Sequence, residues 1–314
     1  MASTYLTLIN NVLRDFNEVE LTSSTFATSR GVQTTVKDYV NRSITDLINS
    51  ELNWPFTRAA GSVDVIAGKS LYSHASIAST LKYVDYDTMF LRPKNYITNG
   101  TYEVSGAASI TGWTTVSGSP AASSKFGNTL LLTSAEASQE ITDLIVGRSY
   151  VVLTQTSGAT LTLKIGTSSG GSQTKSATLT IANGNEVSLT ETTFTATATT
   201  HHVSFVEASG NAAFVKLVEL SEDVLPIPLK YLSYEEYNDA FRERDTRPDT
   251  DKFADPEYVY TTYNDEIGLT PIPDTSNRTL EFDYYVAHTD LSSATDTSII
   301  PTRFEPVVIA RAKY

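Results

Sequence analysis

The sequence predicts an α+β protein, in which a helical lobe and a small antiparallel sheet are interrupted by an inserted all-β sandwich. Three observations support this. Amphipathic helical patterns fill the first 53 residues, period-two alternation dominates from 99 to 221, and a mixture of helix and strand patterns resumes afterwards. A chain of 314 residues also exceeds the usual size of a single hydrophobic core, so we expect more than one domain.

The N-terminal lobe is expected to contain two helices, at 4–17 and 29–53. In the longer one, apolar residues such as Val36 and Val40 recur at steps of three and four, which places them on one buried stripe. Ser29 precedes this pattern and is the expected N-cap. The two helices should therefore pack against each other through their apolar faces.

A proline between two aromatic residues marks the end of the long helix. Pro55 ends it because the residue before a proline is disfavoured in the helical region. We expect Trp54 and Phe56 to form a structural anchor between the helical lobe and the sheet. Beyond them, apolar residues alternate between 63 and 91 with glycines at intervals, which predicts the first strands of the small sheet.

The segment 99–221 differs from its flanks in composition, because it is crowded with Ser, Thr and Gly. Its period-two alternation is clearest at 161–165, 177–181 and 202–206. Short alternating runs between turns are typical of an antiparallel β-sandwich. We therefore expect 99–221 to be a domain inserted into a discontinuous body that is formed by 1–98 and 222–314.

The body resumes with a helix predicted at 233–244. Ser233 and Glu236 have the spacing of a capping box, in which each side chain accepts a hydrogen bond from an amide of the first helical turn. Alternation at 280–286 predicts a further strand, and a last helix is expected at 301–314.

Composition excludes several classes of function. The net charge is −13, and residues 222–314 carry 9 Lys and Arg against 19 Asp and Glu, so no basic surface is available to hold nucleic acid. Cysteine is absent, which excludes disulfides, thiolate metal sites and cysteine nucleophiles. No apolar run approaches the ~18 residues of a membrane span, and a signal sequence is not apparent. We expect a soluble, non-exported chain without a membrane partner.

Three motif-like patterns are better explained by ordinary surface structure. Gly68-Lys69-Ser70 resembles the end of a phosphate loop, but that motif requires a glycine where the chain has Val63. His201 and His202 are adjacent on a predicted strand, so their side chains point to opposite faces and cannot share one metal ion. An acidic loop lacks the turn glycine of a calcium loop. Its carboxylates are Asp249, Asp251, Asp255 and Glu257.

No pair of carboxylates and no serine elbow is singled out for hydrolysis. We therefore expect no enzyme activity, no catalytic, cofactor-binding or metal-binding residues, and no cofactor.

The inserted segment resembles jelly-roll domains of the carbohydrate-binding-module type. The resemblance is carried by Asn99-Gly-Thr-Tyr-Glu103, by Gly112-Trp113, and by strands at 145–151 and 213–220. It implies a jelly-roll fold, in which the tryptophan usually belongs to the core. Trp113 and Tyr102 are nevertheless candidate glycan contacts, since aromatic rings stack on sugars.

With the insert removed, the flanks resemble the head-to-tail adaptor, or tail tubular protein A, of short-tailed bacteriophages. The matching features are Trp54 and Phe56 after the second helix, the Ser-x-Glu-Glu-Tyr helix start at 233–237, Pro271-x-Pro-Asp274, and Ile300-Pro301 before the last helix.

This resemblance implies a structural virion protein in the tail or neck, assembled in the host cytoplasm. Copies would form a homo-oligomeric ring, a dodecamer, with the portal protein above and the tail nozzle protein below, and with tail fibres as further partners. Genomic DNA would pass through without specific binding during ejection, and the jelly-roll would be an outward decoration. The alternative is a carbohydrate-binding tail or receptor-recognition protein, in which the jelly-roll is the active part.

Overall fold

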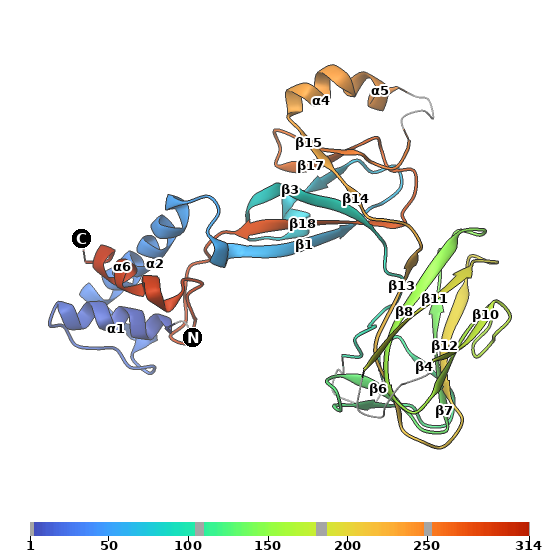
Figure 1. Cartoon of the computed structure of the whole chain (residues 1–314). Helices are drawn as coiled ribbons and strands as arrows, with labels where there is room; N and C mark the ends of the chain where they lie inside the picture. Colours follow the sequence, from blue (N-terminus) through green and yellow to red (C-terminus); the bar gives the residue numbers. More distant parts are fainter. Residues whose placement is uncertain (1–2, 104–109, 180–186, 248–252, 314) are drawn as a thin grey trace. The chain divides into compact units, whose positions relative to one another are not determined.

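The structure is a computed structural model that describes residues 3–103, 110–179, 187–247 and 253–313 (Figure 1). The chain divides into two compact units. The first, which we call the body, comprises Met1–Arg92 and Ile227–Tyr314, and the second, the insert, comprises Pro93–Pro226. The architecture is of the predicted α+β class with a β-sandwich. The unit boundaries fall several residues outside the change in composition at 99 and 221. Strand β3 (Leu81–Pro93) ends before the first of these positions, and β13 (Ala213–Glu222) ends just after the second.

Three helices of the body share one hydrophobic core. They are α1 (Tyr5–Asp15), α2 (Val32–Ser50) and α6 (Glu305–Arg311), with short 3-10 turns at η1 (Phe26–Thr28), η2 (Pro55–Thr57) and η3 (Thr302–Phe304). Leu8, Ile9, Val40, Ile44 and Val308 are almost entirely buried in it. Figure 1 shows α6, from the end of the chain, beside α1 and α2 from its start. Of the described residues, none belongs to a helix long and apolar enough to cross a membrane.

The start of α2 corrects the expected N-cap. Gly31, and not Ser29, occupies the cap position, with φ of 59° and no side-chain hydrogen bond to the helix. The chain must turn through the left-handed region just before Val32, and glycine adopts that conformation at little cost. The carbonyl of Ser29 instead accepts a hydrogen bond from Thr34 Oγ1 at 3.1 Å.

The rest of the body contains two four-stranded sheets instead of a single small one. The first has the order β1 (Arg58–Asp64), β18 (Arg278–Val286), β3, β14 (Ile227–Pro228). The second has the order β15 (Lys230–Leu232), β16 (Tyr258–Thr261), β17 (Glu266–Thr270), β2 (Leu71–Ser73). The pair β15–β16 is parallel, so the expectation of a purely antiparallel sheet is wrong there. A second core, which includes Val84, Val259 and Leu280, joins residues of both sheets.

Short helices complete the body. They are α3 (His74–Ile77), α4 (Tyr234–Ala240) and α5 (Arg242–Thr246). The capping box of α4 is present, with Ser233 N donating to Glu236 Oε2 at 2.8 Å and Glu236 N donating to Ser233 Oγ at 3.2 Å. The single helix predicted at 233–244 is broken at Phe241, whose φ of −125° is not helical and whose ring lies 5.1 Å from that of Tyr258.

The aromatic residues after α2 contact the other end of the chain. The ring of Trp54 lies 5.3 Å from that of Phe56 and 5.6 Å from that of Phe304. The indole N–H of Trp54 donates to Leu47 O at 2.9 Å. Lys82 of β3 donates from Nζ to carbonyl oxygens at the C-terminal end of α2, where a positive charge complements the helix dipole.

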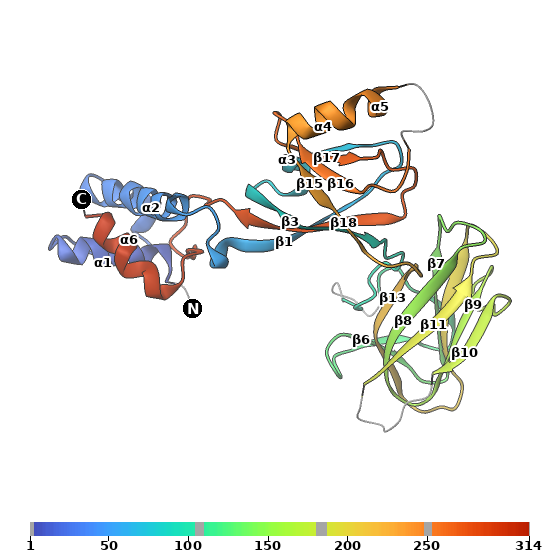
Figure 2. The same cartoon turned by 45° about the horizontal axis from the view of Figure 1, so that its top comes forward.

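The insert is a sandwich of two five-stranded antiparallel sheets (Figure 2). One has the order β10 (Lys175–Leu179), β9 (Leu161–Gly166), β12 (His201–Glu207), β7 (Ala135–Ile141), β4 (Thr114–Ser117). The other has the order β11 (Ser188–Thr195), β8 (Ser149–Gly158), β13, β6 (Thr129–Leu132), β5 (Ala121–Ser123). The core between them includes Leu163, Val203, Phe205, Val215 and Leu220.

Candidate functional site

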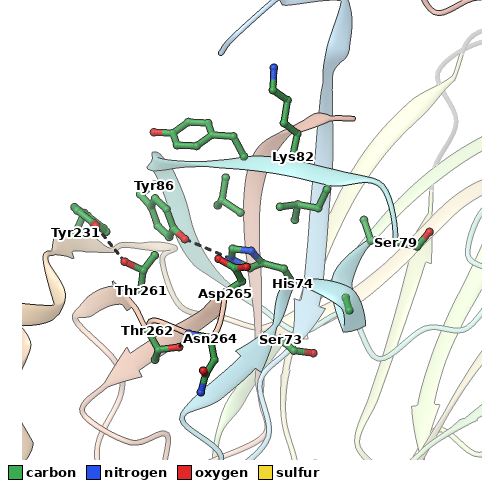
Figure 3. Close-up of a pocket in the computed structure, with 15 residues that line it drawn as sticks. Ser73, His74, Ser79, Lys82, Tyr86, Tyr231, Thr261, Thr262, Asn264 and Asp265 are labelled. Carbon is green, nitrogen blue, oxygen red and sulfur yellow. Dashed lines mark hydrogen bonds between the residues drawn. The ribbon is translucent and has the colours of Figure 1, made fainter. Parts of the chain in front are cut away.

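A groove of about 730 Å³ lies in the body (Figure 3). We call it the edge groove. Its lining comes from β2 and α3, from the first half of β3, from β15, and from the turn between β16 and β17. Polar and aromatic side chains dominate it, and those labelled in Figure 3 include Ser73, His74, Tyr86, Tyr231, Thr261 and Asp265.

Two neutral ring systems meet inside the edge groove. Tyr86 Oη lies 3.5 Å from His74 Nε2, and the two side chains point toward each other in Figure 3. The backbone N–H of His74 donates to Asp265 O at 3.1 Å, which fixes α3 against the β16–β17 turn. Burial lowers the pKa of His74, and Asp265 only partly opposes this, while burial raises the pKa of Tyr86. At neutral pH this pair offers hydrogen-bonding groups and no ionised nucleophile.

The groove is bordered by the exposed edge of a long strand. Strand β3 has 13 residues, but its neighbour β14 pairs only with Phe90 and Leu91. Leu229, which follows β14, donates its N–H to Met89 O at 3.0 Å. Beyond this residue the chain no longer runs along β3, and it forms β15 in the other sheet. Among the described residues, no other strand follows β14 on that side, so 81–88 form an open edge beside the groove.

Tyrosine rings connect the two sides of this opening. The rings of Tyr86, on β3, and Tyr231, on β15, lie 4.8 Å apart, and Tyr231 Oη is 3.3 Å from Thr261 Oγ1. The ammonium group of Lys82 is engaged with α2 carbonyls, and Figure 3 shows this side chain pointing away from His74.

The insert has a smaller pocket of about 220 Å³ beside Trp113. It is lined by Ile110, Trp113, Thr114, Thr115, Pro120, Leu130 and Ala137. The Trp113 ring packs on the sandwich core, 5.8 Å from Phe205, and its buried indole N–H has no hydrogen-bond partner within the described part of the chain.

Tyr102 is fully buried, with its ring 5.4 Å from that of Trp113. The phenol of Tyr102 is therefore not accessible to a glycan in this structure. The direct glycan contact of Tyr102 that the sequence suggested would require an exposed ring, which Tyr102 does not have.

The Asn99 motif is a structural connection. Asn99 Oδ1 accepts the N–H of Glu103 at 2.7 Å, and Asn99 itself has a positive φ of 52°. Gln139 of β7 then binds both sides of the motif, since it accepts from Thr98 N at 3.1 Å and donates to Gly112 O at 2.9 Å. These bonds explain why the residues that resemble the jelly-roll signature lie together.

The two adjacent histidines lie on β12 in different surroundings. His201 is fully buried, with Nε2 3.3 Å from Thr197 Oγ1, whereas His202 Nε2 lies 3.7 Å from the exposed carboxylate of Glu140. In the part of the chain that the structure describes, no group of three or more His, Cys, Asp or Glu side chains is placed to bind a metal ion.

The remaining motif-like residues that the structure describes have structural roles. Gly68 turns with φ of 77° and donates its N–H to Pro273 O at 2.8 Å. Asp255 pairs with the buried guanidinium of Arg278 at 3.1 Å. Asp249 and Asp251 lie outside the described residues.

Sequence reasoning did not find the edge groove. Its side chains come from three separated stretches of sequence, 73–86, 231 and 261–265, and His74 had no neighbour in the sequence to indicate a role. The available signal was the pair of tyrosines in β3, Tyr83 and Tyr86.

Comparison with known families gives a match in the second half of the chain. Residues 171–314 match the model of a family described as SU10 adaptor protein. The matched range contains the whole second segment of the body and the last part of the insert. A search of curated proteins finds no match.

Solved structures share limited similarity with part of the chain. They include the enzymatically active domain of tailspike protein 4 of bacteriophage CBA120, with 16% identity and a TM-score of 0.34, over 41% of this chain and 21% of that chain. TmCBM61, solved with β-1,4-galactotriose, has 18% identity and a TM-score of 0.32, over 41% and 99%. The CBM22-1 xylan-binding domain from Paenibacillus barcinonensis Xyn10C has 10% identity and a TM-score of 0.32, over 41% and 95%. The chain thus spans about a fifth of the tailspike chain, and none of these similarities identifies a ligand.

Proposed function

We propose that this protein is a structural component of a bacteriophage virion, an adaptor between the head and the tail. The observation that carries the proposal is the family match over 171–314. That range includes the second segment of the body, and this segment folds into one compact unit with residues 1–92. The first segment therefore belongs to the same folded unit as the matched region, although the match itself does not reach it.

We further propose that copies of the chain form a ring, a dodecamer, between the portal and the tail nozzle protein. In this arrangement the genome passes through the ring without being held. The net charge of −13 supports that part of the proposal, since an acidic wall repels phosphate groups and lacks the cations that would bind them. The role requires shape and assembly, and no catalytic step.

Electron microscopy of the purified full chain, alone and mixed with its portal protein, tests this proposal. We expect rings with a central channel, and the portal should promote them. A chain that stays monomeric at all concentrations, and that does not bind portal, would contradict it.

A deletion separates the body from the insert in the same experiment. Leu91 and Ile227 are paired across β3 and β14, so their Cα atoms lie ~5 Å apart. A short Gly-Ser linker can therefore replace 94–225 without strain on the body. If the body carries the adaptor role, this shortened chain should remain folded and should form the same rings; aggregation of the shortened chain would contradict the insertion model.

A second candidate function is glycan binding by the insert, and the pocket beside Trp113 favours it. A sugar would contact the accessible part of the Trp113 ring at the pocket. A glycan array probed with the full chain tests this. Trp113→Ala removes the ring, so selective binding should be lost, whereas Trp54→Phe in the body should not affect it. An array without any selective signal would exclude this function for the glycans present.

A further inference from the structure

We propose that the open edge of β3 beside the edge groove binds an extended, basic segment of a partner protein, which adds a strand to the sheet at residues 81–88. The inference rests on the body's own geometry and charge. It does not depend on ring assembly, so failure of the ring experiment would leave it unchanged.

Among the described residues, most of one edge of β3 is unpaired. Strand β14 covers only Phe90 and Leu91, which leaves 81–88 of β3 without a strand on that side in the described structure. A strand edge carries N–H and C=O groups that pair readily with another extended chain. The edge groove of about 730 Å³ lies beside the same residues, so an added strand has room for its side chains.

The two faces of β3 differ. Side chains alternate along a strand, so Val84 and Tyr86 share one face, where both pack on the core of the two sheets. Tyr83, Asp85 and Asp87 belong to the alternate set, and Tyr83 also borders the groove. Burial raises the pKa of Tyr83, and the nearby charges of Asp85 and Asp87 raise it further, which places the three groups close together.

Acidic side chains lie along this edge. In the described residues, Asp85, Asp87 and the groove residue Asp265 form no ion pair, and Asp87 and Asp265 are exposed. The charge of Arg58 acts on Asp85, but Arg58 is ion-paired with Asp283. Lys82 is bound to carbonyl oxygens at the end of α2, and burial lowers the pKa of His74. A bound segment with Lys or Arg at alternate positions would face Asp85 and Asp87. Its other side chains would face Tyr86, Tyr231 and the hydroxyls of the groove.

The experiment uses the isotope-labelled full chain and a capped hexapeptide of alternating lysine and valine. We expect the peptide to shift the amide signals of 81–88. A lysine–proline hexapeptide keeps the charge and the extended shape but lacks every second N–H, and a glutamate–valine hexapeptide reverses the charge. Both should bind at least about tenfold more weakly, since each loses one of the two interactions that the site supplies.

Matched variants locate the charge. The double change Asp85→Lys and Asp87→Lys should weaken the lysine–valine peptide about tenfold, because cross-strand attraction becomes repulsion. The control Glu18→Lys and Asp274→Lys makes the same change of net charge at exposed positions elsewhere in the body and should have no effect.

Equal binding of the lysine–proline peptide, or shifts confined to residues outside 81–88, would overturn the proposal. Self-association of the chain that disappears in the Asp85 and Asp87 variant, without any binding of the peptide, would assign the edge to a second copy and would also overturn it.

Discussion

The body and the insert use opposite ways of building a domain. In the insert, all strands of the sandwich come from one continuous stretch of chain, although among the described strands only β5–β6 and β9–β10 pair strands that are consecutive in sequence. In the body, β1 pairs with β18, so Arg58 lies opposite Tyr285 across more than two hundred residues of sequence. Local patterns therefore describe the insert well, whereas the body depends on a few contacts between its two segments.

The largest expected effect comes from removing one of these long-range contacts. Trp54→Ala deletes the ring that packs on Phe56 and Phe304, and it should lower the free energy of unfolding of the body by ~3–5 kcal/mol. In calorimetry of the full chain, the body transition should move to lower temperature while the insert transition stays in place. An unchanged body transition would show that this aromatic cluster is not the anchor between the segments.

A smaller effect is expected in the insert from a buried carboxylate. Glu207 accepts hydrogen bonds from Ser134 N at 2.8 Å, Ser209 N at 2.7 Å and Gly210 N at 3.1 Å, and from the Ser209 hydroxyl, so it holds two turns together. Glu207→Gln should destabilise the insert by ~1–3 kcal/mol and leave the body transition unchanged, since the amide cannot accept all these bonds.

The same carboxylate gives the insert a dependence on acid. Burial raises the pKa of Glu207, but the hydrogen bonds outweigh burial and hold the pKa below its ordinary value. The stabilisation is therefore complete above the pKa of the unfolded chain and is lost as pH falls through the folded value. Glu207→Gln should flatten this part of a denaturation profile; an unaltered profile would assign the acid sensitivity to other groups.

A further pH effect is expected from His201, at higher pH. The imidazole is buried against Phe194, and burial lowers its pKa below the ordinary value of 6.5. The unfolded chain then binds the proton more tightly, so the insert should lose stability as pH falls from 6.5 towards the folded pKa. His201→Phe should remove this slope, which denaturant titration followed at the insert can measure. The same slope in the variant would exclude His201 as its source.

The smallest effect is expected where a contact lies on the surface. Arg14 and Glu20 form an ion pair at 3.0 Å, but their side chains are 63% and 47% exposed. Arg14→Ala should leave the stability of the body almost unchanged, because solvent screens exposed pairs. A large loss of stability would mean that this exposed ion pair stabilises the helical part of the body, contrary to the expectation.

What the sequence predicts follows this division. Period-two alternation at 161–165, 177–181 and 202–206 overlaps β9, β10 and β12 of the insert, and the Ser233–Glu236 spacing identified a capping box that the structure contains. The break at Phe241 was not visible, because the ring's contact with Tyr258 comes from another element. The N-cap of α2 is Gly31 and not Ser29, because the chain has a positive φ at this position. The preference for polar residues at N-caps does not take such a backbone conformation into account.

The edge groove could not be predicted because it is a product of topology. The groove residues belong to four elements, with His74 on α3, Tyr86 on β3, Tyr231 on β15 and Asp265 in the turn before β17. They meet only because the chain stops pairing with β3 after Leu229 and then joins the other sheet. A sequence shows that β3 is long. It does not show that its neighbour ends after two residues.

The pairing of Leu91 with Ile227 has a consequence for how such proteins diversify. A domain that is inserted between two paired strands needs only N- and C-termini that lie close together. The strands of the host fold then keep the hydrogen bonds between them. This position is therefore suited to exchange of one module for another by recombination, and to engineered display of an unrelated domain with adjacent termini.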